Sequence, residues 1–382
     1  MNSTSRLIAY GIPAMIALCS CQKGIRSTQQ PGSNLRADML NAKPSGPIMG
    51  TVSVFSTGFN NPRGLKFGPD GYLYVAEGGA GGTDSTTGQC TQVPFPVGTY
   101  TGSPTGGRIS KVDWAGIRTT VTDSLPSSNA NEIIGGDVEG VADVAFIGNT
   151  LYALLAGGGC SHGVPSIPNG IVKVNGNGSW TWVANLSDWL MANPVVNPEP
   201  DDFEPDGTWY SMLNVRGDLY ALEPNHGVLV KVTTSGTISK VVDISASQGH
   251  IVPTALAYHG NFYIGNLNTF PITGGASKIL KVTPSGELKV DLPGLNTVLG
   301  LVFDNRDRMY VLEMTAGAPF PTPGMGRILQ VLPSGKITTI VSGLSFPTGM
   351  TMGPDGNLYV SNVGFSPKAI GGGQVLKITI SQ

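Results

Sequence analysis

The stretch GDLYALEPNHG, residues 217–227, is a short run of alternating apolar residues that ends at Glu223 and continues into a loop. Close variants recur along the chain as GYLYVAEGG (71–79), GNFYIGNLN (260–268), DRMYVLEMT (307–315) and GNLYVSNVG (356–364). Alternation of this kind is typical of half-buried strands. Its repetition indicates that the fold is built from copies of one supersecondary unit.

Each unit predicts four antiparallel strands joined by tight turns. PDG (69–71 and 354–356) supplies the turn of a first hairpin, and TPSG (283–286) and LPSG (332–335) supply that of a second, with the Gly and Asp residues that turns prefer. Four-stranded sheets repeated around an axis make a β-propeller, so the sequence predicts an all-β, six-bladed propeller. The six units begin near Asn61, Val138, Trp209, Pro253, Val298 and Pro347.

The last unit reaches Gln382 with only three strands. The missing strand is available near the other end, since TVSVFSTGFNNPRGL (51–65) matches ITTIVSGLSFPTGM (337–350). We therefore expect an N-terminal strand to complete the last blade, which places the propeller domain at residues 50–382.

Composition narrows the function classes. Only 13% of the residues are charged, acidic and basic residues nearly balance, and no basic stripe is present, so the sequence excludes a typical nucleic-acid binder. The 54 Gly and 28 Pro residues are spread between apolar runs, as many short strands require. We expect a monomer with a small molecule or a protein as its partner.

Residues 1–20 resemble a signal peptide, with Arg6 before the apolar run LIAYGIPAMIAL. The sequence LCSC (18–21) resembles a bacterial lipobox, which makes Cys21 the expected lipidation site; an ordinary signal peptide is the alternative. The polar residues 21–49 then form a flexible tether. We expect an exported lipoprotein that faces the periplasm or the cell surface and touches the membrane through its anchor alone.

Cys90 and Cys160 are the remaining cysteines. In an exported protein such a pair forms a disulfide more often than a metal site or a nucleophile. Both follow second strands, in neighbouring blades, which places them on the same face.

The ends of the second strands and the starts of the first strands surround the mouth of the channel. Carboxylate and amide oxygens that converge there suit Ca²⁺ or Mg²⁺, the cations we expect as cofactors. The alternative is that these polar residues satisfy backbone groups or water. The predicted metal ligands are Glu77, Glu223, Asn266, Glu313 and Asn362, and the corresponding residue of the second unit is Leu155.

Other polar residues near the mouth are candidates for ligand binding or catalysis. His250, just before a first strand, is a candidate general base, with a hydrogen bond that stabilises its loop as the alternative. Arg63 is placed to steady a developing oxyanion. The acidic loop EPDDFEPDG (199–207) either binds a cation or is solvated surface. The candidate ligand-binding residues are Glu139, Tyr210, Thr254, Glu204 and His226; His162 lies in a loop on the same face.

Two motifs fail on their context. GCSHG (159–163) matches the G-x-S-x-G pattern of hydrolases, but no helix pattern follows Ser161, and Cys160 is assigned to the disulfide. GGAGGTDSTTG (78–88) is spaced like a phosphate loop but lacks its lysine and its βαβ frame.

The chain resembles the ScyD/ScyE family of exported bacterial propellers in four long stretches, found at 140–165, 197–212, 219–227 and 244–267. The resemblance implies an extracytoplasmic propeller and assigns no chemistry to a residue. The function we expect is ligand or partner binding at the mouth. Two alternatives remain: a metal-dependent lactonase, esterase or lyase similar to gluconolactonase-like and streptogramin-lyase propellers, and a protein-interaction scaffold.

Overall fold

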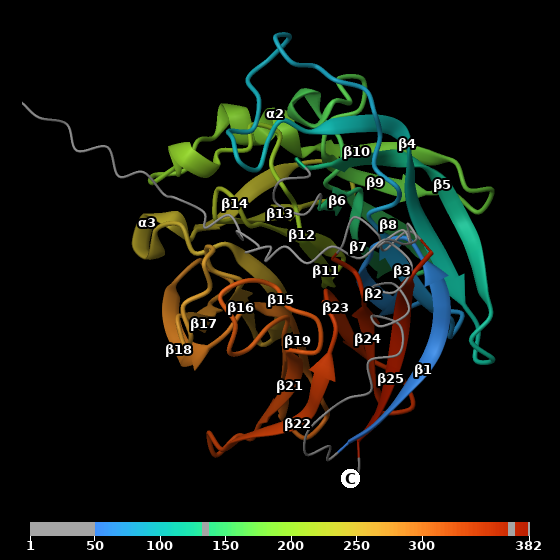
Figure 1. The fold of residues 1–382 in the computed structure, drawn as a ribbon, viewed down its shortest axis with the longest axis vertical. Coiled ribbons are helices and arrows are strands. Elements are labelled where there is room, and N and C mark those ends of the chain that lie inside the picture. The colour runs from blue at the N-terminus through green and yellow to red at the C-terminus, as the bar shows by residue number, and fades with distance from the viewer. Residues whose placement is uncertain (1–49, 132–136, 366–370, 381–382) are drawn as a thin grey trace, which may run out of the picture.

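A computed structural model of the chain describes residues 50–131, 137–365 and 371–380. The predicted signal peptide, Cys21 and the tether lie outside the described residues. Within them the chain forms a six-bladed β-propeller of antiparallel sheets, as the repeats predict. The inner strands contact one another in the ring order β2, β7, β11, β15, β19, β23 and back to β2, and Figure 1 shows them around the centre.

The first three blades follow one another along the chain. Blade 1 contains β2 (Pro62–Phe67), β3 (Leu73–Glu77), β4 (Thr101–Val112), β5 (Arg118–Asn129) and β6 (Val138–Glu139). Blade 2 contains β7 (Val141–Ile147), β8 (Thr150–Leu155), β9 (Gly170–Val174) and β10 (Trp180–Asn185). Blade 3 contains β11 (Ser211–Val215), β12 (Asp218–Glu223), β13 (Val228–Val232) and β14 (Ile238–Asp243).

The other three blades close the ring. Blade 4 contains β15 (Pro253–His259), β16 (Asn261–Asn266), β17 (Ser277–Val282) and β18 (Leu288–Leu295). Blade 5 contains β19 (Val298–Phe303), β20 (Met309–Glu313), β21 (Gly326–Val331) and β22 (Ile337–Leu344). Blade 6 contains β23 (Gly349–Met352), β24 (Leu358–Asn362), β25 (Gly373–Ile380) and, on its outside, β1 (Gly50–Phe59).

The predicted closure of the ring is confirmed. β1 pairs antiparallel with β25, in a register that runs from Gly50 opposite Ile380 to Phe59 opposite Gly373. Blade 6 is therefore made from both ends of the described chain. This arrangement pairs a strand that would otherwise stand as an exposed edge.

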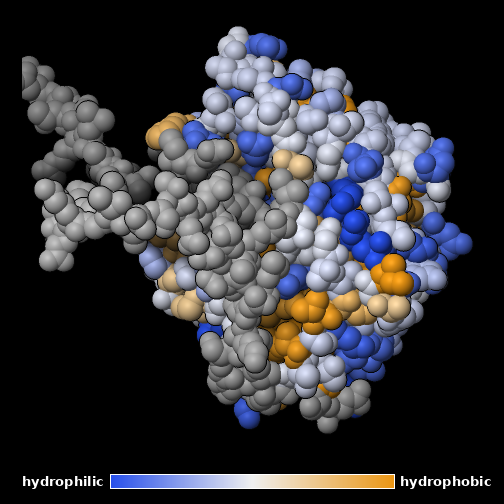
Figure 2. All heavy atoms as spheres, turned by 45° about the vertical axis from the view of Figure 1, so that its right-hand side comes forward, coloured by the Kyte–Doolittle hydropathy of each residue, from blue (hydrophilic) through white to orange (hydrophobic). Residues whose placement is uncertain are grey.

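The helical segments are short and lie in the connections between strands. They are η2 (Cys160–His162), α2 (Leu186–Ala192), η3 (Pro200–Asp202) and α3 (Ser245–Gln248). No helix among the described residues is long and apolar enough to cross a bilayer. On the face shown in Figure 2, most described side chains are polar or of intermediate hydropathy, and the apolar ones gather in small patches.

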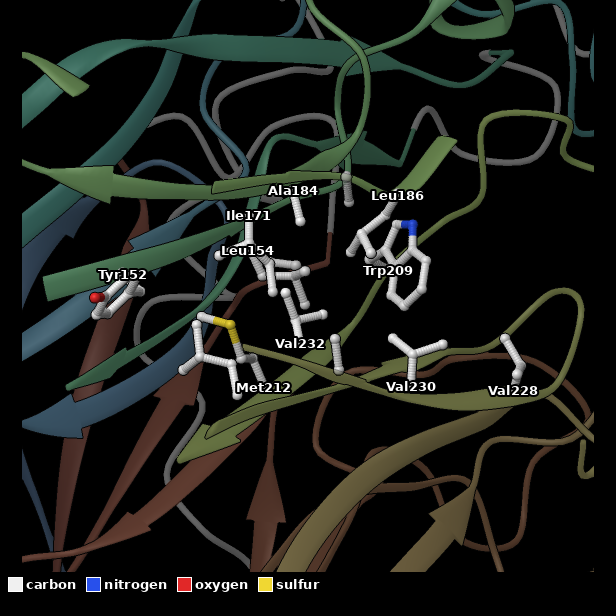
Figure 3. Close-up of a cluster of buried hydrophobic side chains, with 14 of the residues drawn as sticks. Tyr152, Leu154, Ile171, Ala184, Leu186, Trp209, Met212, Val228, Val230 and Val232 are labelled. Atoms are coloured by element: carbon white, nitrogen blue, oxygen red, sulfur yellow. The ribbon is translucent and has the colours of Figure 1, made fainter. Parts of the chain in front are cut away.

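The core lies between the blades. Alternate residues of each strand pack against the next sheet, so a separate apolar cluster fills each gap between neighbouring blades. Figure 3 shows the cluster between blades 2 and 3, where Trp209 packs beside Leu186. Trp209 is only 1% exposed and lies just after the acidic loop (199–207). The apolar cluster therefore anchors the end of that loop next to blade 2.

Candidate metal site at the channel mouth

The ends of the second strands hold the loops that lead into each blade. In blade 1 the carboxylate of Glu77 accepts hydrogen bonds from the Asn60 amide at 2.6 Å and from the Arg108 side chain at 2.9 and 2.6 Å. Glu77 is 0% exposed. Its two oxygens are therefore engaged with protein groups, one of which belongs to the loop before the first strand.

Glu223, which ends the stretch quoted first, has the same role in blade 3. Its oxygens accept hydrogen bonds from the backbone amides of Thr208 at 2.9 Å, Asn225 at 3.2 Å and His226 at 2.6 Å. Burial raises the pKa of this carboxyl, but the neighbouring His226 and these amides outweigh burial and hold it below its usual value. Glu223 therefore stays ionised in a fully buried position.

Three more blades repeat the arrangement with a carboxylate or an amide. These contacts are Asn266 Nδ2 to Ile251 O at 2.8 Å, Asn296 N to Glu313 Oε1 at 2.7 Å and Ser345 N to Asn362 Oδ1 at 3.0 Å. We call Glu77, Glu223, Asn266, Glu313 and Asn362 the clamp residues. Each ties the end of a second strand to the loop before its own blade, as the alternative interpretation of these residues proposed. Their predicted role as metal ligands gains no support from this geometry.

Blade 2 departs from this pattern. Its second strand ends at Leu155, which is fully buried and offers no polar atom. The loop before the blade is held by its backbone instead, because Val138 and Glu139 form β6 and pair with Asn129 and Ser128 of β5. Arg63 also donates to the carbonyl oxygen of Val138 at 2.7 Å. The side chain of Glu139 makes its contacts with Thr208 and His162.

Glu139 lies beside His162 and Glu204. His162 Nε2 is 3.1 Å from Glu139 Oε2 and 3.5 Å from Glu204 Oε2. These three ligand atoms lie within 4.8 Å of one another, and among the described His, Cys, Asp and Glu residues they form the group that can hold a metal ion. The site therefore joins the start of blade 2, the loop after β8 and the acidic loop before blade 3.

The three side chains are almost fully buried. Exposure of the side chain is 0% for His162, 11% for Glu139 and 6% for Glu204. Burial works against a charged His162, but the adjacent carboxylates of Glu139 and Glu204 outweigh it and raise the pKa of His162 to about 10. Burial and repulsion from Glu139 raise the pKa of Glu204 to about 8. In the absence of a bound cation, the group retains protons at neutral pH.

The predicted disulfide between Cys90 and Cys160 is confirmed. It joins the long loop of blade 1 to η2, two residues before His162. Tyr100, just before β4, packs its ring 4.6 Å from the imidazole of His162. The loop that carries His162 is thus fixed from the blade 1 side as well as from blade 3.

Three other predicted residues make contacts between blades. Arg63 bonds to Asp137 at 2.5 Å and is 7% exposed. The hydroxyl of Tyr210 donates to Thr348 O at 2.7 Å, which connects blade 3 to blade 6, and Thr254 Oγ1 donates to Val298 O at 2.5 Å. These contacts connect different blades, and they leave the roles predicted for Arg63, Tyr210 and Thr254 in ligand binding and catalysis without support.

The two remaining histidines of the prediction face blade 3. His250 places Nδ1 3.1 Å from Asn225 O and Nε2 2.9 Å from the carboxylate of Asp202. Both ring nitrogens are engaged with these acceptors, and Asp202 outweighs burial and raises the pKa of His250 above its usual value. A ring held in this way does not act as a base. His226 lies 3.2 Å from Glu223 and belongs to the clamp of blade 3.

Glu139 and Glu204 were predicted as ligand-binding residues from the sequence, whereas His162 was only placed in a loop on the same face. The sequence did not bring the three together, because they come from three separate segments of the chain. One signal was present: Leu155 is the apolar member of an otherwise polar series of strand ends, and it marks the blade where the site lies.

No protein-family model and no curated protein sequence matches the chain. Solved structures share its fold. An oxidoreductase (glucose dehydrogenase) from Thermus thermophilus superposes with a TM-score of 0.54 and 16% identity, over 86% of this chain and 99% of that one. A protein of unknown function from Bacteroides thetaiotaomicron superposes with a TM-score of 0.54 and 11% identity, over 86% of this chain and 76% of that one.

A gluconolactonase from Xanthomonas campestris gives a TM-score of 0.50 and 8% identity, over 89% of this chain and 92% of that one. Identities this low establish likeness of fold and carry no activity across. The chain is a six-bladed β-propeller of the broad fold class that includes the gluconolactonase-like propellers.

Proposed function

We propose that this protein is an exported, lipid-anchored propeller that binds a divalent cation through Glu139, His162 and Glu204, and a small ligand through that cation. The observation that carries the proposal is the state of Glu204. It is 5% exposed, and its Oε2 has no hydrogen-bond partner among the described residues. That oxygen lies on the side of His162 and Glu139.

The charges of the group support a cation. Two carboxylates and one imidazole are buried together, and their charges balance only while both His162 and Glu204 keep a proton, which their raised pKa values of about 10 and about 8 allow. An uncompensated buried charge is costly and is normally paired or bound to a metal. A divalent cation in place of the protons compensates both carboxylates and gives Glu204 Oε2 a partner.

The number of ligands supports binding of a further molecule. Three protein ligands leave at least one coordination position open for water or for an oxygen of a bound ligand, as in catalytic metal sites. Structural sites, in contrast, are usually closed by four protein ligands. The site lies at the channel mouth, where Glu139 retains some exposure.

The same open position favours a second candidate, a metal-assisted hydrolase or lyase. In that case the cation polarises the carbonyl of a lactone or ester. The base predicted for such a reaction, His250, is engaged with Asn225 and Asp202. Binding without catalysis is therefore the better-supported function.

The test compares metal binding by three forms of the soluble chain that begins at Gln22. After removal of metals with a chelator, we expect the wild type to bind about one equivalent of a divalent cation in calorimetry. Glu204→Gln should weaken binding at least about 10-fold, since it removes a charged ligand. The control is Glu313→Gln, which alters a buried clamp carboxylate of similar burial.

Binding that survives Glu204→Gln, or a wild type that binds no cation, would contradict the proposal. Loss of binding in Glu313→Gln alone would instead indicate that the cation binds to the clamp residues, as the sequence predicted. A screen of lactones and esters with the loaded protein then separates the hydrolase from the binding protein.

A further inference from the structure

The motif Gly159-Cys160-Ser161-His162-Gly163 resembles a nucleophile motif, yet the structure gives its serine another environment. Ser161 is 0% exposed, which leaves no room for a substrate at its hydroxyl. The hydroxyl donates to Asp206 Oδ2 at 2.6 Å, and the backbone amide of Ser161 donates to the same oxygen at 2.8 Å. Ser161 is thus held by one carboxylate through two bonds.

The remaining contact of the hydroxyl determines which ring nitrogen of His162 carries a proton when the cation is bound. Ser161 Oγ lies 3.2 Å from His162 Nδ1. A hydroxyl has one proton, and that proton is already donated to Asp206, so towards the imidazole Ser161 can only accept. Nδ1 therefore carries a proton, and the lone pair available to a cation is that of Nε2, the nitrogen that faces Glu139 and Glu204.

The glycines of the motif permit this close packing. A Cβ atom on Gly159 would overlap the carboxylate of Asp206, and Gly159 has a φ of 96°. On the other side, a Cβ atom on Gly163 would overlap the carbonyl oxygen of Asp84 in the blade 1 loop. The motif needs glycine at both ends because it packs tightly between Asp206 and the blade 1 loop.

Glu139 is oriented in a comparable way. Its Oε1 accepts a hydrogen bond from the hydroxyl of Thr208 at 2.7 Å, which turns Oε2 towards His162. One ligand atom of each of these two side chains is thus aimed into the group by a hydrogen bond made on its other side. Partners of this kind fix the orientation of metal ligands and raise their affinity.

We propose that Ser161 and Asp206 are positioning residues that present His162 Nε2 to the cation, so that the site takes a first-row transition metal such as Zn²⁺ or Mn²⁺ rather than Ca²⁺ or Mg²⁺. This inference rests on the proposed function. Imidazole nitrogen with two carboxylates is a donor set for such metals, whereas Ca²⁺ and Mg²⁺ prefer oxygen ligands alone. Sequence reasoning expected the oxygen-preferring cations from a ring without histidine.

The experiment titrates the metal-free soluble chain with Zn²⁺, Mn²⁺, Ca²⁺ and Mg²⁺ separately, in the wild type, Ser161→Ala and Asp206→Asn. The matched control is Ser110→Ala, because Ser110 is also 0% exposed and also donates to a carboxylate, that of Glu77. The visible spectrum of the Co²⁺ form serves as a second measurement, since it reports the ligand geometry, and a thermal melt checks folding.

We expect Zn²⁺ or Mn²⁺ to bind the wild type at least about 100-fold more tightly than Ca²⁺. Ser161→Ala and Asp206→Asn should each weaken that binding about 10- to 100-fold and alter the Co²⁺ spectrum, and Ser110→Ala should change neither.

Equal or tighter binding of Ca²⁺ would overturn the inference and leave the proposed function standing. So would unchanged affinity and an unchanged spectrum in both Ser161→Ala and Asp206→Asn. A wild type that binds none of the four cations would overturn the proposed function as well. If either of these variants fails to fold, the selectivity of the wild type still decides the choice of metal.

Discussion

Blade 2 and the five clamped blades hold the loop that enters the blade in different ways. In blades 1, 3, 4, 5 and 6 a polar side chain at the end of the second strand bonds to the loop that enters the blade. In blade 2 the same loop is held as a strand, β6, on the edge of blade 1. The comparison teaches that one repeat can hold its entry loop by backbone pairing where the other repeats use a side chain.

Other features that the clamped blades lack also lie around blade 2. Glu139, the disulfide and the acidic loop all lie around this blade, and the contacts that fix His162 come from blade 1 and from the loop before blade 3. The clamped blades contain buried carboxylates too, but each is satisfied by amides or by arginine. Burial of acidic groups alone therefore does not distinguish a candidate site in this fold, whereas a buried carboxylate oxygen without a hydrogen-bond partner, such as Glu204 Oε2, does.

The largest effect is expected for Glu77→Ala, in a clamped blade. Removal of this carboxylate leaves the side chain of Arg108, which is 14% exposed, without its partner. Breaking such a buried pair should lower the free energy of unfolding by about 3–5 kcal/mol. Urea unfolding of the metal-free protein measures it, with Glu77→Gln as the milder control. A loss below about 1 kcal/mol would show that the clamp is dispensable.

The disulfide comes next, on the side of blade 2. It closes a loop between residues that are 70 positions apart, so reduction or Cys90→Ser with Cys160→Ser should cost about 2–4 kcal/mol. We also expect the cation to bind more weakly, because Cys160 adjoins Ser161. Melting curves and metal titrations with and without reductant test both effects. Identical curves would mean that the blade 1 loop contributes nothing to the site.

The third effect is the contribution of the site to the pH dependence of stability. The pKa values of His162 and Glu204, about 10 and about 8, both exceed their ordinary values of 6.5 and 4.5. The folded state therefore binds more protons than the unfolded state, and stability falls as pH rises. The contribution of His162 is complete below pH 6.5 and is lost by about pH 10; that of Glu204 is lost between about pH 4.5 and 8.

In the metal-free protein stability should therefore decline between about pH 5 and 9, and the decline should be smaller in Glu204→Gln. Urea unfolding in a chelator at three pH values measures the slope. Addition of the cation should flatten it, because the cation takes the place of the protons. A wild-type slope equal to that of Glu204→Gln would speak against a shifted Glu204.

The smallest effect is expected for Asn362→Ala, in blade 6. The amide is neutral and makes two hydrogen bonds, with Ser345 N at 3.0 Å and Gln374 Oε1 at 3.2 Å. Leaving these groups without partners should cost about 1–2 kcal/mol. Thermal melts give the value. A cost as large as that of Glu77→Ala would mean that charge adds nothing to the clamp.

The fold was predictable because it depends on patterns that repeat. Strand alternation, turn residues and the match between 51–65 and 337–350 predicted six blades and the closing strand, and the cysteine pair in loops of neighbouring blades predicted the disulfide. Each of these features depends on the order of residues along the chain. The added strand β6 was not predicted, because two residues carry no periodicity.

The site was predictable only in part. The sequence identified the strand ends, but it could not show that an amide of the preceding loop lies within 3 Å of each oxygen, as for Glu77 and Glu313. It identified Glu139 and Glu204 singly. Their meeting with His162 depends on how blades 1, 2 and 3 pack, and the hold of Ser161 on that imidazole depends on the approach of Asp206. Such distances have no counterpart in sequence spacing.

The pairing of β1 with β25 has a consequence for how the protein is made. β1, the first of the described strands in chain order, finds its partner β25 only after five other blades have been synthesised. Until then β1 is an unpaired edge, open to association with other chains. Ring closure also acts as a completeness check: a chain truncated before Gly373 has no partner for β1, and this defect is visible to proteases and chaperones that recognise unpaired strands.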